Sequence, residues 1–229
     1  MSEYKLDCSH CSLASLCMPL GLTPDELKLL STMAIEQRNF KPNEPLFRSE
    51  QPFTNLYAIR SGSFKTVTIT PSGSEHVVGF YLPGEWLGLH AIHRQRYAMT
   101  ALALETSAVC VIPYTELTTA TQSIPSLQQY VFSMMSEKLN PDRYVDPNSS
   151  AENRIARLLL SLSQRYTRRG YSAREFRLSM SREEMGRYLG LATETVSRIF
   201  TQLAQQNIIE IQRREVKLVD LEQLEDLMG

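Results

Sequence analysis

The sequence lacks the long apolar runs and the leader that would carry a chain into or across a membrane. No apolar run approaches the roughly 18 residues of a membrane-spanning helix. Residues 1–17 do not show the basic-then-apolar order of a secretory signal peptide. Hydrophobic residues make up 42% of the chain and charged residues 21%, as in ordinary globular proteins. We therefore expect a cytoplasmic protein whose thiols stay reduced.

Motifs of catalysis are also missing. The chain contains no Gly-x-Gly-x-x-Gly fingerprint, P-loop, nucleophile elbow or His-Glu-x-x-His metal motif. His90 and His93 have a spacing that could serve a metal, but we interpret them as loop residues. The sequence therefore favours a binding or regulatory protein over an enzyme.

Cysteine is scarce, and its distribution is uneven. Of the 4 cysteines, Cys8, Cys11 and Cys17 form a C-x2-C-x5-C pattern, and Cys110 lies far along the chain. Four thiolates are the ligand count of an iron–sulfur cluster or a structural zinc site. The simpler alternative is that they are unrelated small buried residues. The spacing alone does not choose between iron–sulfur and zinc.

Residues 181–205 show the pattern of a helix-turn-helix. Residues 181–184 form a capping-box sequence that begins a short helix, and this helix ends at residues 189–190. A longer helix follows over residues 193–203, with polar and apolar side chains on opposite faces. The polar face holds Glu194, Ser197, Arg198, Thr201 and Gln202, and the apolar face holds Val196, Ile199, Phe200 and Leu203. The second helix of such a motif enters the DNA major groove.

The charge of the chain supports DNA binding by this region. Residues 151–217 hold 13 Lys and Arg, 12 of them Arg, against 7 Asp and Glu, although the whole chain carries a net charge of −1. A basic block around a helix-turn-helix matches a phosphate surface. Apolar runs at 208–211 and 216–219 predict a β-hairpin wing whose turn carries Arg213 and Arg214. Together with Thr195, these arginines complete the candidate DNA-binding residues.

The middle of the chain has the pattern of β structure. Residues 56–60 and 63–70 flank a Ser-Gly pair, which predicts a hairpin. Further short runs follow at 77–82 and at 108–113, and the latter carries Cys110. Many short strands with glycine turns indicate an antiparallel barrel or roll.

Residues 124–140 predict a helix that ends before Pro141. It carries an apolar stripe of Leu127, Val131, Met134, Met135 and Leu139. The stripe could pack on its own roll, or it could join two copies into a homodimer, since palindromic DNA is read by two-fold dimers. We expect four segments: a cysteine-bearing arm and short helix (1–35), a β-roll sensor domain (36–120), a dimerisation helix and linker (121–150), and a winged helix-turn-helix domain (151–229). The fold class is α+β.

Several motifs resemble one known family. They are Cys8-x2-Cys11-x5-Cys17, Leu-Tyr-Ala-Ile-Arg-Ser-Gly at 56–62, Ala-Leu-Glu-Thr-Ser-Ala-Val-Cys-Val-Ile-Pro at 103–113, Glu-Phe-Arg-Leu-Ser-Met at 175–180, and Tyr-Leu-Gly-Leu-Ala-Thr-Glu-Thr-Val-Ser-Arg at 188–198. Over nearly its whole length the chain resembles the oxygen-sensing Fnr/Anr branch of the cyclic-AMP receptor protein/Fnr superfamily of bacterial transcription regulators. The resemblance implies a cyclic-nucleotide-binding-like jelly roll, a long dimerisation helix and a winged helix-turn-helix.

The resemblance also implies a mechanism. Cys8, Cys11, Cys17 and Cys110 would hold an oxygen-labile four-iron four-sulfur cluster, which controls homodimerisation and transcription activation. The family's Glu-x-x-Ser-Arg reading motif falls on residues 194–198, and its sites are palindromes of TTGAT half-sites. Double-stranded DNA and RNA polymerase are the implied partners, with residues 72–75 as the candidate polymerase surface.

Two expectations concern other ligands. Relatives that bind a cyclic nucleotide hold its phosphate with an Arg-Ser pair, and here Tyr97 and Ala98 align with that pair, so we expect no cyclic nucleotide. The alternative to the iron–sulfur function is a regulator of the same fold gated by haem, a small molecule in the roll, or zinc at the cysteines.

Overall fold

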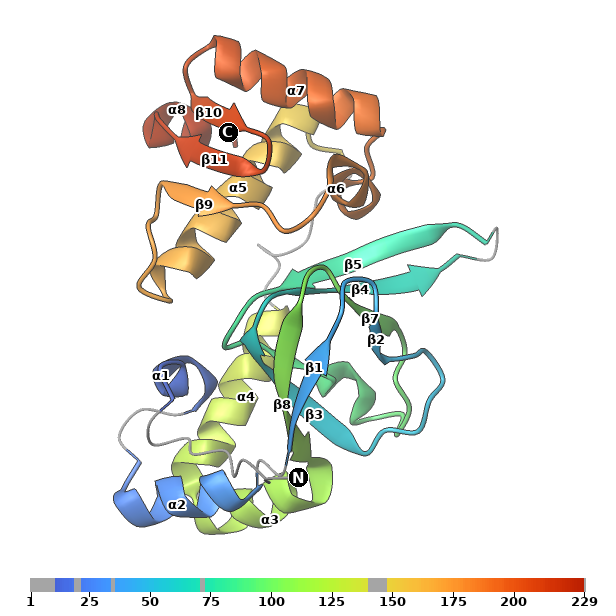
Figure 1. The fold of residues 1–229 in the computed structure, drawn as a ribbon, viewed down its shortest axis with the longest axis vertical. Coiled ribbons are helices and arrows are strands. Elements are labelled where there is room, and N and C mark those ends of the chain that lie inside the picture. The colour runs from blue at the N-terminus through green and yellow to red at the C-terminus, as the bar shows by residue number, and fades with distance from the viewer. Residues whose placement is uncertain (1–10, 19–21, 34–35, 71–72, 140–147, 229) are drawn as a thin grey trace. The chain divides into compact units, whose positions relative to one another are not determined.

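A computed structural model describes residues 11–18, 22–33, 36–70, 73–139 and 148–228 (Figure 1). The chain divides into two compact units, one of residues 1–68 and 78–141 and the other of residues 69–77 and 142–229. Helices and antiparallel strands occur in both, which confirms the α+β class. In the described part of the chain, no helix combines the length and the apolar character that a bilayer crossing requires.

Two antiparallel four-stranded sheets build the first unit and confirm the predicted roll. The first sheet has the order β1-β8-β3-β6, with β1 at Glu36–Phe40, β8 at Ser107–Pro113, β3 at Asn55–Ser61 and β6 at Trp86–Leu87. The second has the order β2-β7-β4-β5, with β2 at Pro45–Phe47, β7 at Thr100–Ala103, β4 at Phe64–Ile69 and β5 at Glu75–Tyr81. A short 3-10 helix, η2 (Leu89–Ala91), follows β6.

The predicted hairpin around the Ser-Gly pair is wrong, although both of its strands exist. β3 pairs with β8 and β6, whereas β4 pairs with β7 in the other sheet. Leu56 and Ile59 are fully buried, so β3 is a central strand that needs a neighbour on each side. A register shift between Ile59 and Ser61 bends the strand where the chain changes sheets. The same Ser-Gly chemistry therefore makes a corner here and not a hairpin turn.

Helices α1 (Ala14–Cys17), α2 (Pro24–Met33), α3 (Tyr114–Ser123) and α4 (Pro125–Leu139) also belong to the first unit. α2 is the short helix expected within residues 1–35. It is capped at its start, since the Thr23 hydroxyl accepts the Glu26 amide at 3.3 Å and the Glu26 carboxylate accepts the Thr23 amide at 2.7 Å. α4 confirms the predicted helix. α3 was not expected: the chain turns into it directly after β8, and it buries Leu117 and Ala120, three residues apart on one face.

The second unit contains α5 (Ala151–Thr167), α6 (Arg182–Leu189), α7 (Thr193–Gln205) and α8 (Leu221–Asp226). Its sheet has the order β10-β11-β9, with β10 at Ile209–Gln212, β11 at Glu215–Leu218 and β9 at Glu175–Arg177. This is the predicted winged helix-turn-helix, with β9 as an additional strand. Its core contains Ile155, Leu159 and Leu162 of α5, all at most 1% exposed.

Candidate nucleic-acid interface and candidate metal centre

The first helix of the motif begins where the sequence predicts. The Ser181 hydroxyl accepts the Glu184 amide at 3.1 Å, and the Glu184 carboxylate accepts the Ser181 amide at 2.7 Å. These reciprocal bonds form a capping box and satisfy two donors at the start of α6. Gly190 ends the helix in the left-handed conformation, with φ of 66°. Arg154 of α5 donates to the Leu189 carbonyl at 2.8 Å and so fixes this end to the core.

Gly186 is a residue that the sequence analysis did not single out. A Cβ atom at this position would lie 2.5 Å from the Leu191 carbonyl oxygen. The turn between α6 and α7 therefore passes directly over α6, and only glycine leaves room for it. The signal was a glycine inside a helical pattern, which usually marks a close backbone approach.

α7 has the two faces that its periodicity predicts. Val196, Ile199, Phe200 and Leu203 are at most 2% exposed, which confirms the apolar face. Glu194, Ser197, Arg198 and Thr201 are exposed, and Thr195 is half-buried. Because four side chains anchor the helix, its outer face is held in a fixed orientation relative to the second unit.

Gln202 is the exception on the polar face. Its side chain is half-buried, and its amide donates to the Glu152 carboxylate of α5 at 3.0 Å. This interaction points the Gln202 side chain toward α5, so Gln202 connects α7 to α5. Periodicity alone could not separate it from its exposed neighbours.

The exposed side chains of α7 differ in what they offer a ligand. The Ser197 and Thr201 hydroxyls donate to the carbonyls of Thr193 at 2.9 Å and of Ser197 at 3.1 Å. Their oxygen lone pairs are left as acceptors. Among the described residues, Glu194 and Arg198 make no hydrogen bond or ion pair. The carboxylate and the guanidinium are thus both available to a partner.

The wing turn lies beside the start of α6. A hollow of about 220 Å³ is lined by Leu178, Met180, Ser181, Arg182, Arg213 and Arg214. Arg213 is exposed at the turn with φ of 58°, and Arg214 donates to the Ser179 carbonyl at 3.1 Å. The Arg182 guanidinium stacks 3.3 Å from the centre of the Phe200 ring, and burial lowers the pKa of Arg182 to about 10. Arg182 is therefore charged at neutral pH, and it is a candidate that the sequence analysis missed.

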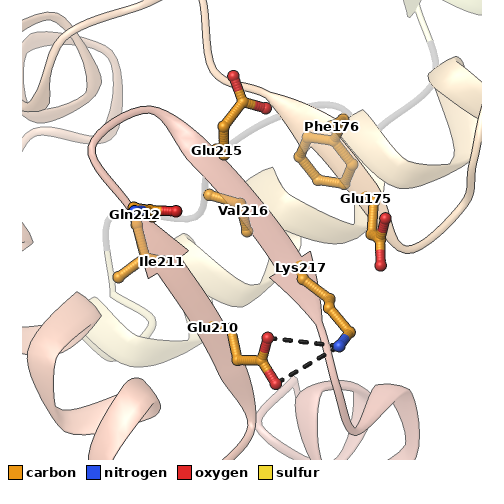
Figure 2. Close-up of a pocket in the computed structure, with 8 residues that line it drawn as sticks. All are labelled: Glu175, Phe176, Glu210, Ile211, Gln212, Glu215, Val216 and Lys217. Carbon is orange, nitrogen blue, oxygen red and sulfur yellow. Dashed lines mark hydrogen bonds and ion pairs between the residues drawn. The ribbon is translucent and has the colours of Figure 1, made fainter.

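The outer face of the wing sheet has a different character (Figure 2). A hollow of about 420 Å³ on this sheet is lined by Glu175, Phe176, Glu210, Ile211, Gln212, Glu215, Val216 and Lys217. Lys217 pairs with Glu210 at 3.3 Å, and Arg177 pairs with Glu215 at 3.8 Å. Carboxylates thus neutralise the cations on this face. The part of the wing suited to phosphate is its turn.

The apolar stripe of α4 serves the first unit's own core in its first half. Leu127 is 2% exposed, and Val131 and Met134 are half-buried against the same core. Met135 is half-buried and Leu139 is 73% exposed. Phe132, which the sequence analysis did not name, is 61% exposed. On α4, the apolar surface left to a partner is therefore formed by Phe132, Met135 and Leu139.

Three of the four cysteines fall in the described residues, and Cys8 lies outside them. Cys110 is in β8, where it pairs with Ala58 of β3, which in turn pairs with Trp86 of β6. Residues paired across antiparallel strands project from the same face, so Cys110, Ala58 and Trp86 form one row. Neighbouring strands are about 4.8 Å apart, which puts the Cα atoms of Cys110 and Trp86 roughly 10 Å apart.

Cys17 approaches this same face. The indole nitrogen of Trp86 donates to the Cys17 carbonyl at 3.2 Å. The Cys11 carbonyl accepts the Ala14 amide at 3.0 Å at the start of α1. Cys17 and Cys110 are both half-buried against the core of the first unit. Within the described residues, no group of three His, Cys, Asp or Glu side chains is close enough to hold a metal.

The interior of the roll is filled by aromatic side chains. Tyr97 is 2% exposed, stacks on Phe47 at 4.0 Å between ring centres and donates to the Asn55 carbonyl at 2.7 Å. Arg96 donates to the Glu50 carbonyl at 2.6 Å. His90 packs against Phe47, and its pKa is lowered to about 4 by burial and, second, by the charge of Lys138. Tyr97, at the place that aligns with a nucleotide-binding pair, is thus a core side chain.

Comparisons with known proteins agree with both units. Residues 153–227 match the Crp-like helix-turn-helix domain, and residues 37–123 match the cyclic nucleotide-binding domain. The chain is 41% identical to the transcriptional activator protein anr of Pseudomonas aeruginosa, over 97% of this chain and 92% of the relative. It is 37% identical to the anaerobic regulatory protein of Pasteurella multocida, over 98% of this chain and 83% of the relative.

A solved structure has the same fold. FixK2 from Bradyrhizobium japonicum superposes with a TM-score of 0.77 at 24% identity, covering 85% of this chain and 97% of that chain.

Proposed function

The chain belongs to the Fnr/Anr branch of the cyclic-AMP receptor protein/Fnr superfamily of bacterial transcription regulators, and from this premise we propose that it is an oxygen-responsive, DNA-binding transcription activator of the cytoplasm. Its relatives are regulators, and it is not an enzyme. The observation that carries the DNA-binding half is the outer face of α7, with unpaired Glu194 and Arg198 on a helix that four buried side chains anchor.

The chemistry of α7 suits a specific half-site. Arg198 can donate a bidentate pair of hydrogen bonds to guanine O6 and N7, and Glu194 can accept a hydrogen bond from a cytosine amine. Ser197 can accept from a neighbouring base amine or pack against a thymine methyl group. Guanine, cytosine and thymine contacts of this kind fit a palindrome of TTGAT half-sites. Thr195 and Thr201 flank these contacts.

Phosphate contacts would come from the hollow between the wing turn and α6. Arg182, Arg213 and Arg214 bring three guanidinium groups to it, which suits a phosphate. Phosphate contacts supply affinity and register but no sequence preference. This division of labour gives separate predictions for the two sets of residues.

A homodimer is the form that would read a palindrome. The exposed Phe132 and Leu139 and the half-buried Met135 of α4 are its proposed contacts. Two copies bind one operator, so a small change in dimerisation gives a large change in occupancy. Leu127, Val131 and Met134 would support this surface from the subunit's own core.

We assign Cys8, Cys11, Cys17 and Cys110 as ligands of a four-iron four-sulfur cluster. Two members of this set support the assignment: Cys17 and Cys110 are half-buried against one core, and the Trp86 contact brings Cys17 to the sheet face that bears Cys110. When bound, the cluster supplies oxygen-reactive iron–sulfur chemistry. The chain's own residues supply the thiolates, exclude water from part of the site, and connect the arm to α4.

Two further predictions stay open. Contact with RNA polymerase is expected at residues 72–75, of which residue 72 lies outside the described residues. A regulator gated by haem, a small molecule or zinc is the alternative. The packed aromatic interior around Tyr97 and Phe47 disfavours a ligand such as a cyclic nucleotide in the roll.

An absorption spectrum of anaerobically purified protein, recorded before and after air, tests the proposal. We expect a brown protein whose visible absorbance and operator affinity both fall in air. Iron, sulfide and zinc analysis of the same sample separates iron–sulfur from zinc, and the spectrum reveals haem. A colourless protein that binds the operator equally with and without air would contradict the oxygen-responsive function.

A further inference from the structure

We propose that Trp86 and Tyr130 are positioning residues that dock the N-terminal arm and so hold Cys17 in place for metal binding. Trp86 donates its indole N–H to the Cys17 carbonyl at 3.2 Å, and Tyr130 of α4 donates its hydroxyl to the Leu16 carbonyl at 2.5 Å. The two donors come from the roll and from α4, and they hold adjacent carbonyls. The metal-binding role of Cys17 rests on the proposed function. The docking of the arm by Trp86 and Tyr130 does not depend on it.

α1 needs such docking because it is too short to persist alone. It has 4 residues, no side-chain cap, and no buried residue within its bounds. An isolated single turn is unstable in water because its nucleation cost is not recovered. The last carbonyls of a helix have no partner within the helix, and here Trp86 and Tyr130 supply two partners. The docking contacts therefore decide whether this turn exists.

The docking surface is also shaped for the arm. Gly84 has φ of 86°, and a Cβ there would lie 2.7 Å from the Leu16 Cβ atom. The Leu16 side chain thus contacts the backbone of the turn before β6. The Trp86 and Tyr130 rings contact each other edge to face, with centroids 6.4 Å apart. The Trp86 and Tyr130 side chains are therefore positioned by contact with each other as well as by their hydrogen bonds to the arm.

One consequence is a mechanical connection between Cys17 and the dimer helix. Tyr130 lies two residues before Phe132, on a helix whose exposed apolar residues form the proposed dimer surface. Figure 1 shows α1 beside α4. Metal binding that stabilises α1 also stabilises the Tyr130 contact, because linked equilibria reinforce each other reciprocally. The sensor arm therefore acts on α4 through Tyr130.

Amide hydrogen exchange of metal-free protein tests the docking. The amides of Leu16, Cys17 and Met18 donate within α1, so their protection reports whether the turn is formed. Tyr130→Phe removes only the hydroxyl, and Trp86→Phe removes the indole N–H. We expect exchange of a peptide covering residues 13–18 to become about fivefold faster in each variant. Tyr114→Phe, at a ring that packs on Phe53, is the matched control and should leave exchange unchanged.

Release of iron to a chelator without oxygen tests the positioning of Cys17. After anaerobic reconstitution, Tyr130→Phe should lose its visible absorbance about fivefold faster than the wild type and the control. If amide exchange of residues 13–18 were as slow in Tyr130→Phe and Trp86→Phe as in the wild type, the proposed docking would be overturned. Faster exchange with unchanged iron release would overturn the role in positioning Cys17. A wild-type protein that takes up no iron overturns the proposed function, and exchange then still decides the docking.

Discussion

The recognition helix α7 and the cysteine-bearing turn α1 present functional groups by opposite means. α7 has 13 residues and four apolar side chains at most 2% exposed. α1 has 4 residues, and hydrogen bonds from Trp86 and Tyr130 hold its last carbonyls. The first is stable because of its own periodicity, and the second depends on residues far along the chain.

This difference matches what the proposed function requires of each region. Reading bases requires side chains that are already in place, because ordering them on binding would cost affinity. A sensor needs an element of low local stability, since only such an element changes state for a small change in free energy. Substitutions should therefore act locally in α7 and at a distance in α1.

The largest effect is expected at the arm. Cys17→Ser removes one of the proposed thiolate ligands, and an incomplete ligand set should hold no stable cluster. We expect the anaerobic protein to be colourless and its operator binding to be weak and insensitive to air. Iron analysis and a gel-shift titration measure both. Ser12→Ala in the same segment is the control and should keep colour and binding.

The second-largest effect is expected in the recognition of individual bases by α7. Arg198→Ala should cost roughly 1–3 kcal/mol of binding free energy and relax the preference at one base pair, because a bidentate guanine contact is lost. Binding to operators altered one base pair at a time measures this. Gln205→Ala, exposed on the last turn of α7, should leave the preference unchanged. An unaltered preference in Arg198→Ala would refute the assignment.

The same contrast explains what the sequence could predict. The two faces of α7 follow from the periodicity of its own residues, and the capping box of α6 joins residues only three apart. The hairpin at the Ser-Gly pair failed because strand pairing depends on residues elsewhere: β3 needed neighbours on both sides. Gln202 was placed with the reading face because periodicity cannot show that Glu152 accepts its amide.

The sequence predicted which cysteines form the candidate metal centre, but not where in the fold they lie. Four cysteines can be counted in a sequence, whereas the row from Cys110 to Trp86 exists only once β3, β6 and β8 are paired. The Tyr130 contact spans 114 residues of sequence, and no local pattern marks it. Long-range hydrogen bonds of this kind are invisible to spacing arguments.

Lowering the pH should reduce the folding stability of the first unit through the protonation of His90. Burial lowers the pKa of His90 from 6.5 to about 4, so the unfolded chain binds the proton first as the pH falls. Between about pH 6.5 and 4 the unfolded state holds more protons, and stability therefore falls with falling pH. Denaturant titrations should show a loss of about 1–2 kcal/mol between pH 7 and 5. His90→Gln should flatten this part of the profile, and an unchanged profile would contradict the buried neutral histidine.

The dimer surface should respond more weakly. Phe132→Ser removes an apolar side chain that is 61% exposed, so the folded subunit should keep its stability. Burial of such a ring against a partner contributes about 1 kcal/mol per copy when it is partial. Sedimentation at several concentrations should show a weaker dimer. Ser133→Ala, the exposed neighbour, is the control, and equal dimerisation in Phe132→Ser would exclude this face.

The smallest effect is expected at the wing turn. Arg213 has φ of 58°, so Arg213→Asn removes the charge while keeping a residue that tolerates this conformation. Losing one phosphate contact should weaken every DNA sequence about threefold and reduce the salt dependence of log K by about 0.9 per subunit. Lys217→Gln is the control, because Glu210 already pairs with Lys217. If the loss of affinity differed among operator sequences, the wing turn would contact bases. The proposed division between base contacts from α7 and phosphate contacts from the hollow would then be wrong.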